Sequence, residues 1–125
     1  MRLWFRMAAA ILVMTAAPAQ AAPANDFATF WPKFIAAVAN DDQATLASMT
    51  RLGPGLGDDS ATFAKFHAAH LGPAARRCLA KARPVRDVDP SSGGEYNYSA
   101  FCGQVIYGFS KTAGAWKLTD LGVND

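Results

Sequence analysis

The segment 101–120 places several reactive types of side chain within a few residues of one another. Its sequence, FCGQVIYGFSKTAGAWKLTD, contains Cys102, Tyr107 and Asp120 and is typical of two strands around a tight Ala-Gly turn. Pairing the strands across a two-residue turn places Tyr107 opposite Asp120 on the apolar face of the hairpin. Apolar surroundings disfavour the charged form of a carboxylate and so favour its use as a general base. This register predicts a catalytic pair, with Asp120 as the base and Tyr107 as a hydrogen-bond donor.

A structural role for Asp120 is the alternative interpretation. At the end of a strand, half in water, its carboxylate accepts hydrogen bonds from Tyr107 or from a helix-end amide. A register shift of one residue turns Asp120 to the other face of the sheet. A buried Asp120 that lines a cavity would favour an enzyme.

Two histidines form a second candidate site. His67 and His70 are three residues apart on an expected helix, so both side chains are able to approach one metal ion. A stable zinc site needs three or four protein ligands, and no third ligand of matching spacing is evident. We therefore predict no metal and, because phosphate- and dinucleotide-binding glycine motifs are also missing, no cofactor.

A basic segment is the third candidate. Five cationic residues and no acidic one occur between positions 76 and 86: Arg76, Arg77, Lys81, Arg83 and Arg86. Such a cluster is suited to a phosphate, a sulfated sugar or an acidic partner protein. The alternative is a solvated face that Asp87 and Asp89 partly neutralise.

The first 21 residues have the pattern of a secretory signal peptide. Two arginines precede an apolar run from Met7 to Ala17, and the Ala-Gln-Ala at 19–21 fits the cleavage rule. The run is shorter than the roughly 20 residues of a membrane-spanning helix. We expect an exported chain of one domain, residues 22–125, that is periplasmic or, alternatively, fully secreted.

Removal of this leader changes the charge balance. Without Arg2 and Arg6, ten basic residues face ten acidic residues. A balanced charge gives no reason to expect nucleic acid or, after cleavage, a membrane as a partner. A small ligand or a protein partner is expected instead, and a homodimer is possible.

Cys78 and Cys102 are the only cysteines, and both belong to the part expected to be exported. An even number of cysteines in an oxidising compartment favours a disulfide. Closing a loop of this length stabilises a fold by roughly 3 to 4 kcal/mol on the chain-entropy model.

The periodicity of apolar residues changes near Pro84. Before it, three- and four-residue spacings predict helices. Their expected ranges are about 26–39, 42–49, 58 or 59 to 71, and 73–82. The Asp41-Asp42 pair is expected to end the first helix and cap the second, and Asp58 or Asp59 to cap the third. Pro32 implies that the first helix either begins near Trp31 or kinks. After Pro84, two-residue alternation predicts strands at 85–88, 96–110 and 115–121. Helices followed by strands predict an α+β fold, with the helices packed on one face of a curved antiparallel sheet of three to four strands.

The order of these elements resembles the NTF2-like (cystatin-like α+β) superfamily. The segments FATFWPKFIAAVANDDQATLASMT and FSKTAGAWKLTDLGVND carry the resemblance: an aromatic helix, an Asp-capped second helix and a terminal Gly-x-Trp-Lys-Leu hairpin. The resemblance implies a sheet curled around the first helix, with a pocket at the open end of the cone. Families with this fold include isomerases and dehydratases as well as members that only bind a ligand or dimerise, so the fold does not determine the function.

Three functions are compatible with the sequence. The first is an exported, disulfide-stabilised, non-enzymatic protein that binds a small ligand or a partner protein through the cone mouth or the basic segment. The second is a small isomerase- or lyase-like enzyme that uses Asp120 and Tyr107. The third is an inhibitor or immunity protein for an exported enzyme, for which one charged face would be the signature.

Overall fold

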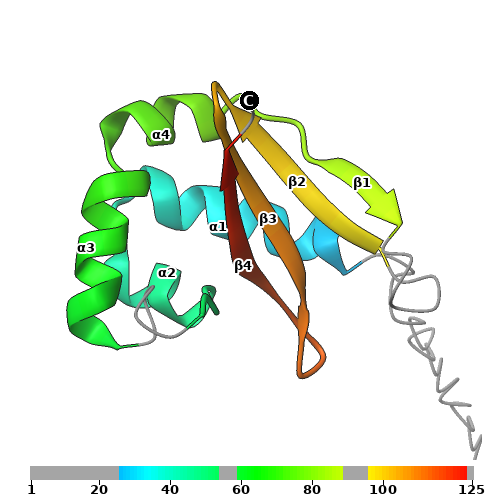
Figure 1. The fold of residues 1–125 in the computed structure, drawn as a ribbon, viewed down its shortest axis with the longest axis horizontal. Coiled ribbons are helices and arrows are strands. Elements are labelled where there is room, and N and C mark those ends of the chain that lie inside the picture. Colours follow the sequence, from blue (N-terminus) through cyan, green and yellow to red (C-terminus); the bar gives the residue numbers. More distant parts are fainter. Residues whose placement is uncertain (1–25, 54–58, 89–95, 124–125) are drawn as a thin grey trace, which may run out of the picture.

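The computed structural model describes residues 26–53, 59–88 and 96–123, and it shows an α+β fold (Figure 1). The helices come first: α1 (Phe27–Ala39), α2 (Gln43–Ser48), α3 (Ser60–His70) and α4 (Pro73–Leu79). The strands follow: β1 (Val85–Val88), β2 (Tyr96–Cys102), β3 (Val105–Thr112) and β4 (Ala115–Val123). The predicted fold class is confirmed. The expected signal peptide, residues 1–21, lies outside the described residues.

The four strands form one antiparallel sheet in the order β1-β2-β3-β4. Ala113 and Gly114 connect β3 to β4 with φ angles of 51° and 80°, so both central residues of this turn are left-handed, as in a type I′ hairpin. Gly103, with φ of 63°, begins the turn between β2 and β3. The single strand predicted at 96–110 is therefore wrong. A glycine turn breaks it into two strands, and the apolar run that follows Gly103 obscures the break.

Two aspartates begin helices as the sequence predicts. The Asp42 carboxylate accepts hydrogen bonds from the backbone N–H and the hydroxyl of Thr45, at 3.2 and 2.6 Å. Asp59 and Thr62 form a reciprocal capping box at the start of α3. Side-chain and backbone hydrogen bonds from Thr45 lower the pKa of Asp42, because they stabilise its charged form.

Two further observations concern the helix boundaries. α1 begins at Phe27, close to the start of the expected range 26–39 and not near Trp31, so Pro32 lies inside the helix. Its missing N–H leaves the carbonyl of Ala28 without the usual helical partner. α4 ends at Leu79, before the predicted end near Ala82.

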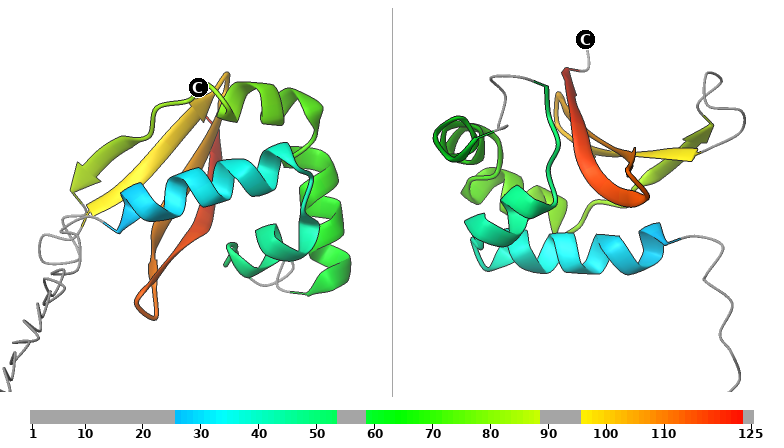
Figure 2. Two further views of the ribbon diagram at one scale, coloured as in Figure 1. Left: turned by 180° about the vertical axis from the view of Figure 1, so that it is seen from behind. Right: turned by 90° about the horizontal axis from the view of Figure 1, so that it is seen from below.

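Aromatic residues of α1 pack on the inner face of the sheet. The rings of Phe27 and Tyr98 stack with their centroids 3.8 Å apart, and the edge of Phe34 meets Phe109 at 5.1 Å. Phe34 and Phe109 are 0% and 1% exposed, so this layer is the centre of the core. Figure 2 shows α1 running across this face while the sheet curves around it. Large side chains therefore fill the concave face of the sheet.

The chain after α2 covers part of the free edge of β4. Leu118 donates its N–H to the carbonyl of Met49, and the N–H of Arg51 donates to the carbonyl of Leu118, both at 2.8 Å. These bonds bring the end of α2 against the hairpin and leave β1 as the opposite edge of the sheet.

The predicted disulfide between Cys78 and Cys102 is present and connects α4 to the end of β2. The two Cα atoms are 5.8 Å apart, a usual separation for a disulfide. It ties the helical layer to the sheet beside the β2–β3 turn.

Replacing both cysteines, as Cys78→Ala with Cys102→Ala, is expected to lower the free energy of unfolding by about 2 to 5 kcal/mol. Without the disulfide the loop is open in the unfolded chain, which therefore regains conformational entropy. Urea unfolding of the oxidised wild type and of the variant measures the change. Reduced wild type is the control and should match the variant. Equal stability of the oxidised wild type and the variant would contradict a structural role for this bond.

Candidate functional site

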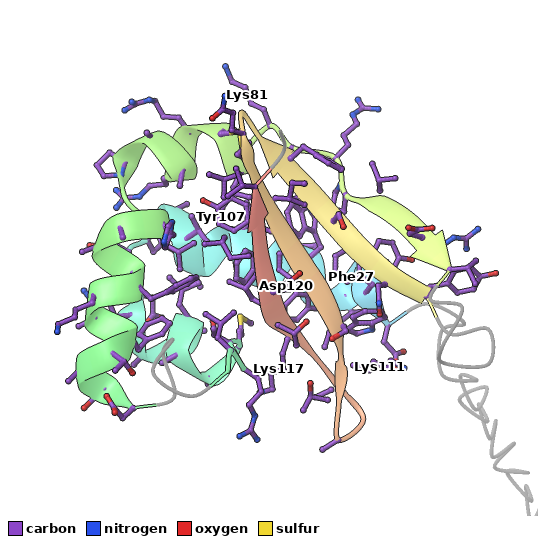
Figure 3. All side chains as sticks on the ribbon, viewed as in Figure 1. Phe27, Lys81, Tyr107, Lys111, Lys117 and Asp120 are labelled. Carbon is purple, nitrogen blue, oxygen red and sulfur yellow. A yellow bond between two sulfur atoms is a disulfide. The ribbon has the colours of Figure 1, made fainter. Side chains whose placement is uncertain are left out.

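The structure separates the predicted pair of Tyr107 and Asp120. Asp120 lies opposite Gly108, and Tyr107 lies opposite Leu121, because the register shifts between Gly108 and Phe109. Neighbouring residues of a strand point to opposite faces. Tyr107 therefore faces the helices, and Asp120 is exposed on the outer face (Figure 3). The predicted juxtaposition is wrong by one residue.

Gly108 is the signal in the sequence that indicates this irregularity. A Cβ atom built at position 108 would lie 3.0 Å from the Cβ of Asp120, closer than side chains normally approach. Glycine inside a strand often marks a bulge or a close approach of another group. Here it gives space to the carboxylate on the outer face.

Tyr107 has a structural partner on the helical side. Its ring is 2% exposed, and its hydroxyl donates a hydrogen bond of 2.5 Å to the carbonyl of His70, the last residue of α3. The last carbonyls of a helix have no partner within the helix, so this bond satisfies one of them. Burial raises the pKa of the Tyr107 phenol above its ordinary value and keeps it in the form that donates this bond.

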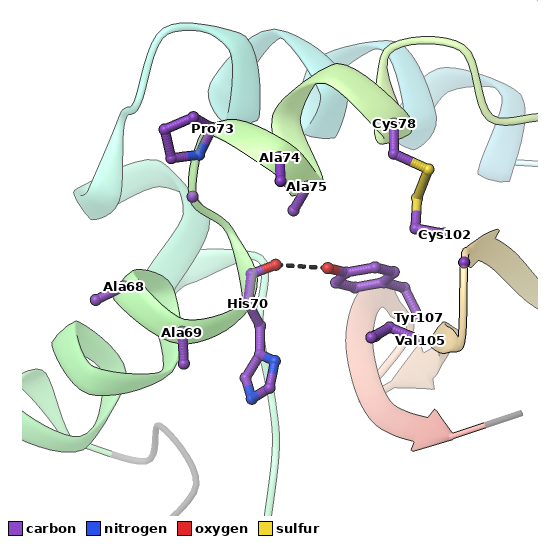
Figure 4. A pocket seen from close by; sticks show the side chains of 12 residues that line it. Ala68, Ala69, His70, Pro73, Ala74, Ala75, Cys78, Cys102, Val105 and Tyr107 are labelled. Atoms are coloured by element: carbon purple, nitrogen blue, oxygen red, sulfur yellow. Dashed lines mark hydrogen bonds between the residues drawn. A yellow bond between two sulfur atoms is a disulfide. The ribbon is translucent and has the colours of Figure 1, made fainter.

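A cleft of about 510 Å³ opens beside Tyr107, between the end of α3, α4 and the β2–β3 turn. We call it the α4 cleft. Tyr107, His70, Gly103 and both cysteines line it (Figure 4). Four alanines line it as well: Ala68, Ala69, Ala74 and Ala75. The space exists because the two helices present methyl groups where larger side chains would fill it.

Two cross-links hold the walls of the α4 cleft together. The disulfide joins α4 to β2 on one side, and the Tyr107–His70 hydrogen bond joins β3 to the end of α3 on another. The helices that form the cleft are therefore fixed to the sheet independently of any ligand, and the cleft is preformed.

The two histidines do not point at a common centre. His67 is 6% exposed, and its Nε2 lies 2.8 Å from Oδ1 of Asp41. A guanidinium nitrogen of Arg76 lies 3.5 Å from the same oxygen. Asp41 thus connects the α1–α2 corner to α3 and α4. In the described ranges there is no group of three or more His, Cys, Asp or Glu side chains able to hold a metal ion.

The five cations of the basic segment lie in different surroundings. Arg76 is partly buried against Asp41, and the guanidinium of Arg86, on β1, lies 4.3 Å from the ring centroid of Tyr96. The other three, Arg77, Lys81 and Arg83, are exposed. The structure therefore does not bring the whole segment together as one site, and it leaves three cations available on the surface around the end of α4.

The sequence predicts a helix corner at Asp41 but not the contacts that Asp41 makes with His67 and Arg76. The backbone of Asp41 has a φ of 52°, in the left-handed region that aspartate tolerates better than most residues.

Among the helices that the structure describes, none has the length and apolar character that a membrane span requires.

These features define a small α+β protein with a preformed cleft at the junction of its helices and its sheet. Comparisons of the chain with family models, with curated proteins and with solved structures find no match. The resemblance to the NTF2-like superfamily therefore stays a prediction.

Tyr107→Phe is expected to lower the stability at neutral pH by about 0.5 to 1.5 kcal/mol, because the His70 carbonyl loses its donor. The phenol has a raised pKa in the folded state, so its contribution is present below about pH 10 and is lost as the pH rises through the folded pKa. The stability difference between wild type and variant should shrink at alkaline pH.

Urea unfolding of both proteins over a pH series measures this difference. A constant difference across the alkaline range would show that the Tyr107 phenol ionises equally easily in the folded and unfolded states.

Asp41→Asn and Asp41→Ala separate the charge of Asp41 from its backbone conformation. Asn tolerates the left-handed region but removes the negative charge beside His67 and the ion pair with Arg76, so a modest loss of stability is expected. Ala loses both features and should unfold more easily than Asn by about 1 to 2 kcal/mol. Thermal unfolding of the three proteins tests this order. Identical melting of the Asn and Ala variants would mean that the φ angle of 52° carries no cost.

Proposed function

We propose that this chain is an exported, disulfide-braced binding protein that holds a small, mainly apolar ligand in the α4 cleft, without catalysing a reaction. The observation that carries the proposal is a preformed space of about 510 Å³ lined mostly by small side chains, four alanines among them. Ligand pockets are usually hollows of about 300 to 1,000 Å³ with predominantly apolar walls and a few polar groups. The α4 cleft has this size and this character.

The polar groups of the cleft suit a ligand with at most one or two hydrogen-bonding atoms. The imidazole of His70 belongs to the lining, whereas the hydroxyl of Tyr107 already donates to a backbone carbonyl. An imidazole either donates or accepts, so one hydroxyl or carbonyl on an otherwise apolar ligand is satisfied there.

Export completes the proposal. The pattern of residues 1–21 supports a cleaved leader, and the Cys78–Cys102 disulfide supports an oxidising compartment such as the periplasm. In such a compartment the disulfide persists and keeps α4 fixed beside the cleft.

The enzyme hypothesis depends on Asp120 and Tyr107 lying side by side, and they do not. A base and a hydrogen-bond donor must reach the same substrate, but Asp120 lies on the outer face and Tyr107 on the inner face of the sheet. The inhibitor hypothesis has less support than a ligand cleft because Arg76 and Arg86 are engaged within the chain, which divides the cationic surface.

Binding of small fragments to the oxidised protein tests the proposal. The chain is expressed with its leader, recovered from the exported fraction, and expected to begin at Ala22. Indole, cresol and cyclohexanol are then titrated while amide NMR shifts are recorded. We expect the largest shifts at Ala69, Ala74 and Gly103, which line the cleft.

Two matched variants locate the binding. Ala68 and Ala64 are both exposed alanines of α3, but only Ala68 lines the cleft. Ala68→Leu should fill the space and reduce the fragment-induced shifts severalfold, whereas Ala64→Leu should behave as wild type. Melting curves establish that both variants fold. Shifts absent from the cleft residues, or an equal response of the two variants, would overturn the proposal.

A further inference from the structure

A second cleft, of about 520 Å³, lies between the first half of α1, the end of α2 and the β3–β4 hairpin. We call it the hairpin cleft. It shares no residue with the α4 cleft and differs from it in chemistry. Its apolar part is formed by Phe30, Met49 and Trp116, and its charged part by Asp26, Lys33 and Lys117.

The apolar part of the hairpin cleft is a rigid surface. Trp116 packs edge-on against Phe27 and Tyr98, with centroid distances of 5.1 and 5.4 Å. Met49 is fixed by its backbone, because its carbonyl accepts from Leu118. An aromatic ring and a thioether together form a contact surface suited to a flat or aliphatic group.

The acidic residue of the hairpin cleft already has a cationic partner. Asp26 lies 3.4 Å from the ammonium of Lys111, which comes from the facing strand. This pair sits at the N-terminal end of α1. Lys33 lies seven residues further along, about 10 Å along the helix axis at the usual rise per residue.

The other two charged residues of the hairpin cleft, Lys33 and Lys117, are cations. The ammonium of Lys117 donates to the carbonyl of Ser48, which holds it at the end of α2. One donor is used in this way, and an ammonium has three. Figure 3 shows Lys117 and Lys111 on different sides of the hairpin, and Lys111 is the residue that donates to Asp26. Neither Lys33 nor Lys117 forms an ion pair within the described part of the chain.

We propose that the hairpin cleft binds a small amphipathic anion, with an apolar body on Phe30, Met49 and Trp116 and a single carboxylate at Lys33 and Lys117. The charge of the cleft selects against a cation, and the apolar surface selects against a bare inorganic anion. The site is independent of the α4 cleft and of the function proposed for it.

Three probes with the same body test this selectivity: phenylbutyrate, phenylbutanol and phenylbutylamine. Each is titrated into the oxidised protein while amide and indole N–H shifts are recorded by NMR. We expect the anion to bind most tightly, the alcohol more weakly and the amine most weakly, with the largest shifts at Trp116 and Lys117. Acetate, which has the carboxylate without the body, should cause no saturable shift.

Charge-removing variants identify the cations involved. Lys33→Gln with Lys117→Gln should weaken phenylbutyrate binding by about fivefold, as expected for two solvent-accessible ion pairs, and should leave phenylbutanol unchanged. Lys65→Gln removes an exposed lysine of α3 that lines neither cleft and should have no effect. High salt should reproduce the effect of the double variant.

Three results would overturn this proposal: equal affinity for the three probes, an equal response of Lys65→Gln and the double variant, or shifts confined to the α4 cleft. The last result would remove the hairpin cleft as a site while supporting the α4 cleft. If the fragments do not bind the α4 cleft in the experiment with Ala68→Leu, the phenylbutyrate test still applies, because the two clefts share no residue.

Discussion

The structure depends on the packing of the α1 aromatic residues against the inner face of the sheet. Phe27 on Tyr98 and Phe34 on Phe109 join the first element of the fold to strands near its end. Each buried aromatic residue removes about 150 to 250 Å² from water, at roughly 25 cal/mol per Å². For a domain whose net stability is about 5 to 15 kcal/mol, such contacts decide which face of each strand turns inward. Once Phe109 and Leu118 are inward, Gly108 is outward, and the shift beside Gly108 sends Asp120 to the outer face with it.

The same packing determines where a ligand has room. Large side chains fill the concave face of the sheet, which is where a cone-shaped fold would otherwise have its pocket. Space remains in two places, and different segments form the walls of each. In one of them α3 and α4 contribute alanines and leave a hollow, and the disulfide holds α4 beside the end of β2. In the other the chain after α2 binds the edge of β4 and brings Met49 beside Trp116. The two clefts therefore differ in chemistry because different segments close them.

Local signals in the sequence predicted local structure well. Asp42 and Asp59 begin helices where expected because a helix start needs a nearby acceptor, and a cysteine pair in a chain with a leader indicated the disulfide. The failures lie where one residue changes the register. Gly103 divides a run that reads as one strand, and the irregularity at Gly108 reverses the face of Asp120. Alternation of apolar residues cannot locate such an insertion, because it has a period of two on both sides.

The sequence does not predict features that form only where several helices or strands meet. The cluster of Asp41, His67 and Arg76 requires three helical segments to meet, and neither spacing nor composition encodes that meeting. The clefts are harder still, because a cleft is defined by side chains that are small or absent. The alanines of α3 and α4 have high helix propensity, and this propensity alone explains their presence in the sequence. Their role as a wall emerges only when the sheet is placed opposite them.

The outer edge of the sheet limits the ways in which a second molecule binds. β1 is a short edge strand, and Val85 and Val88 are 53% and 50% exposed, which by itself would favour pairing with another chain. In two identical antiparallel strands related by a two-fold axis, the residue at the axis lies opposite itself. If the axis passes through Arg86, the two guanidinium groups lie opposite each other. If it passes through Asp87, the two carboxylates do, and both arrangements are unfavourable because like charges repel. The middle of β1 therefore resists self-pairing, and a homodimer of this protein would need a different surface or an off-centre register, whereas an unlike strand with complementary charges meets no such penalty.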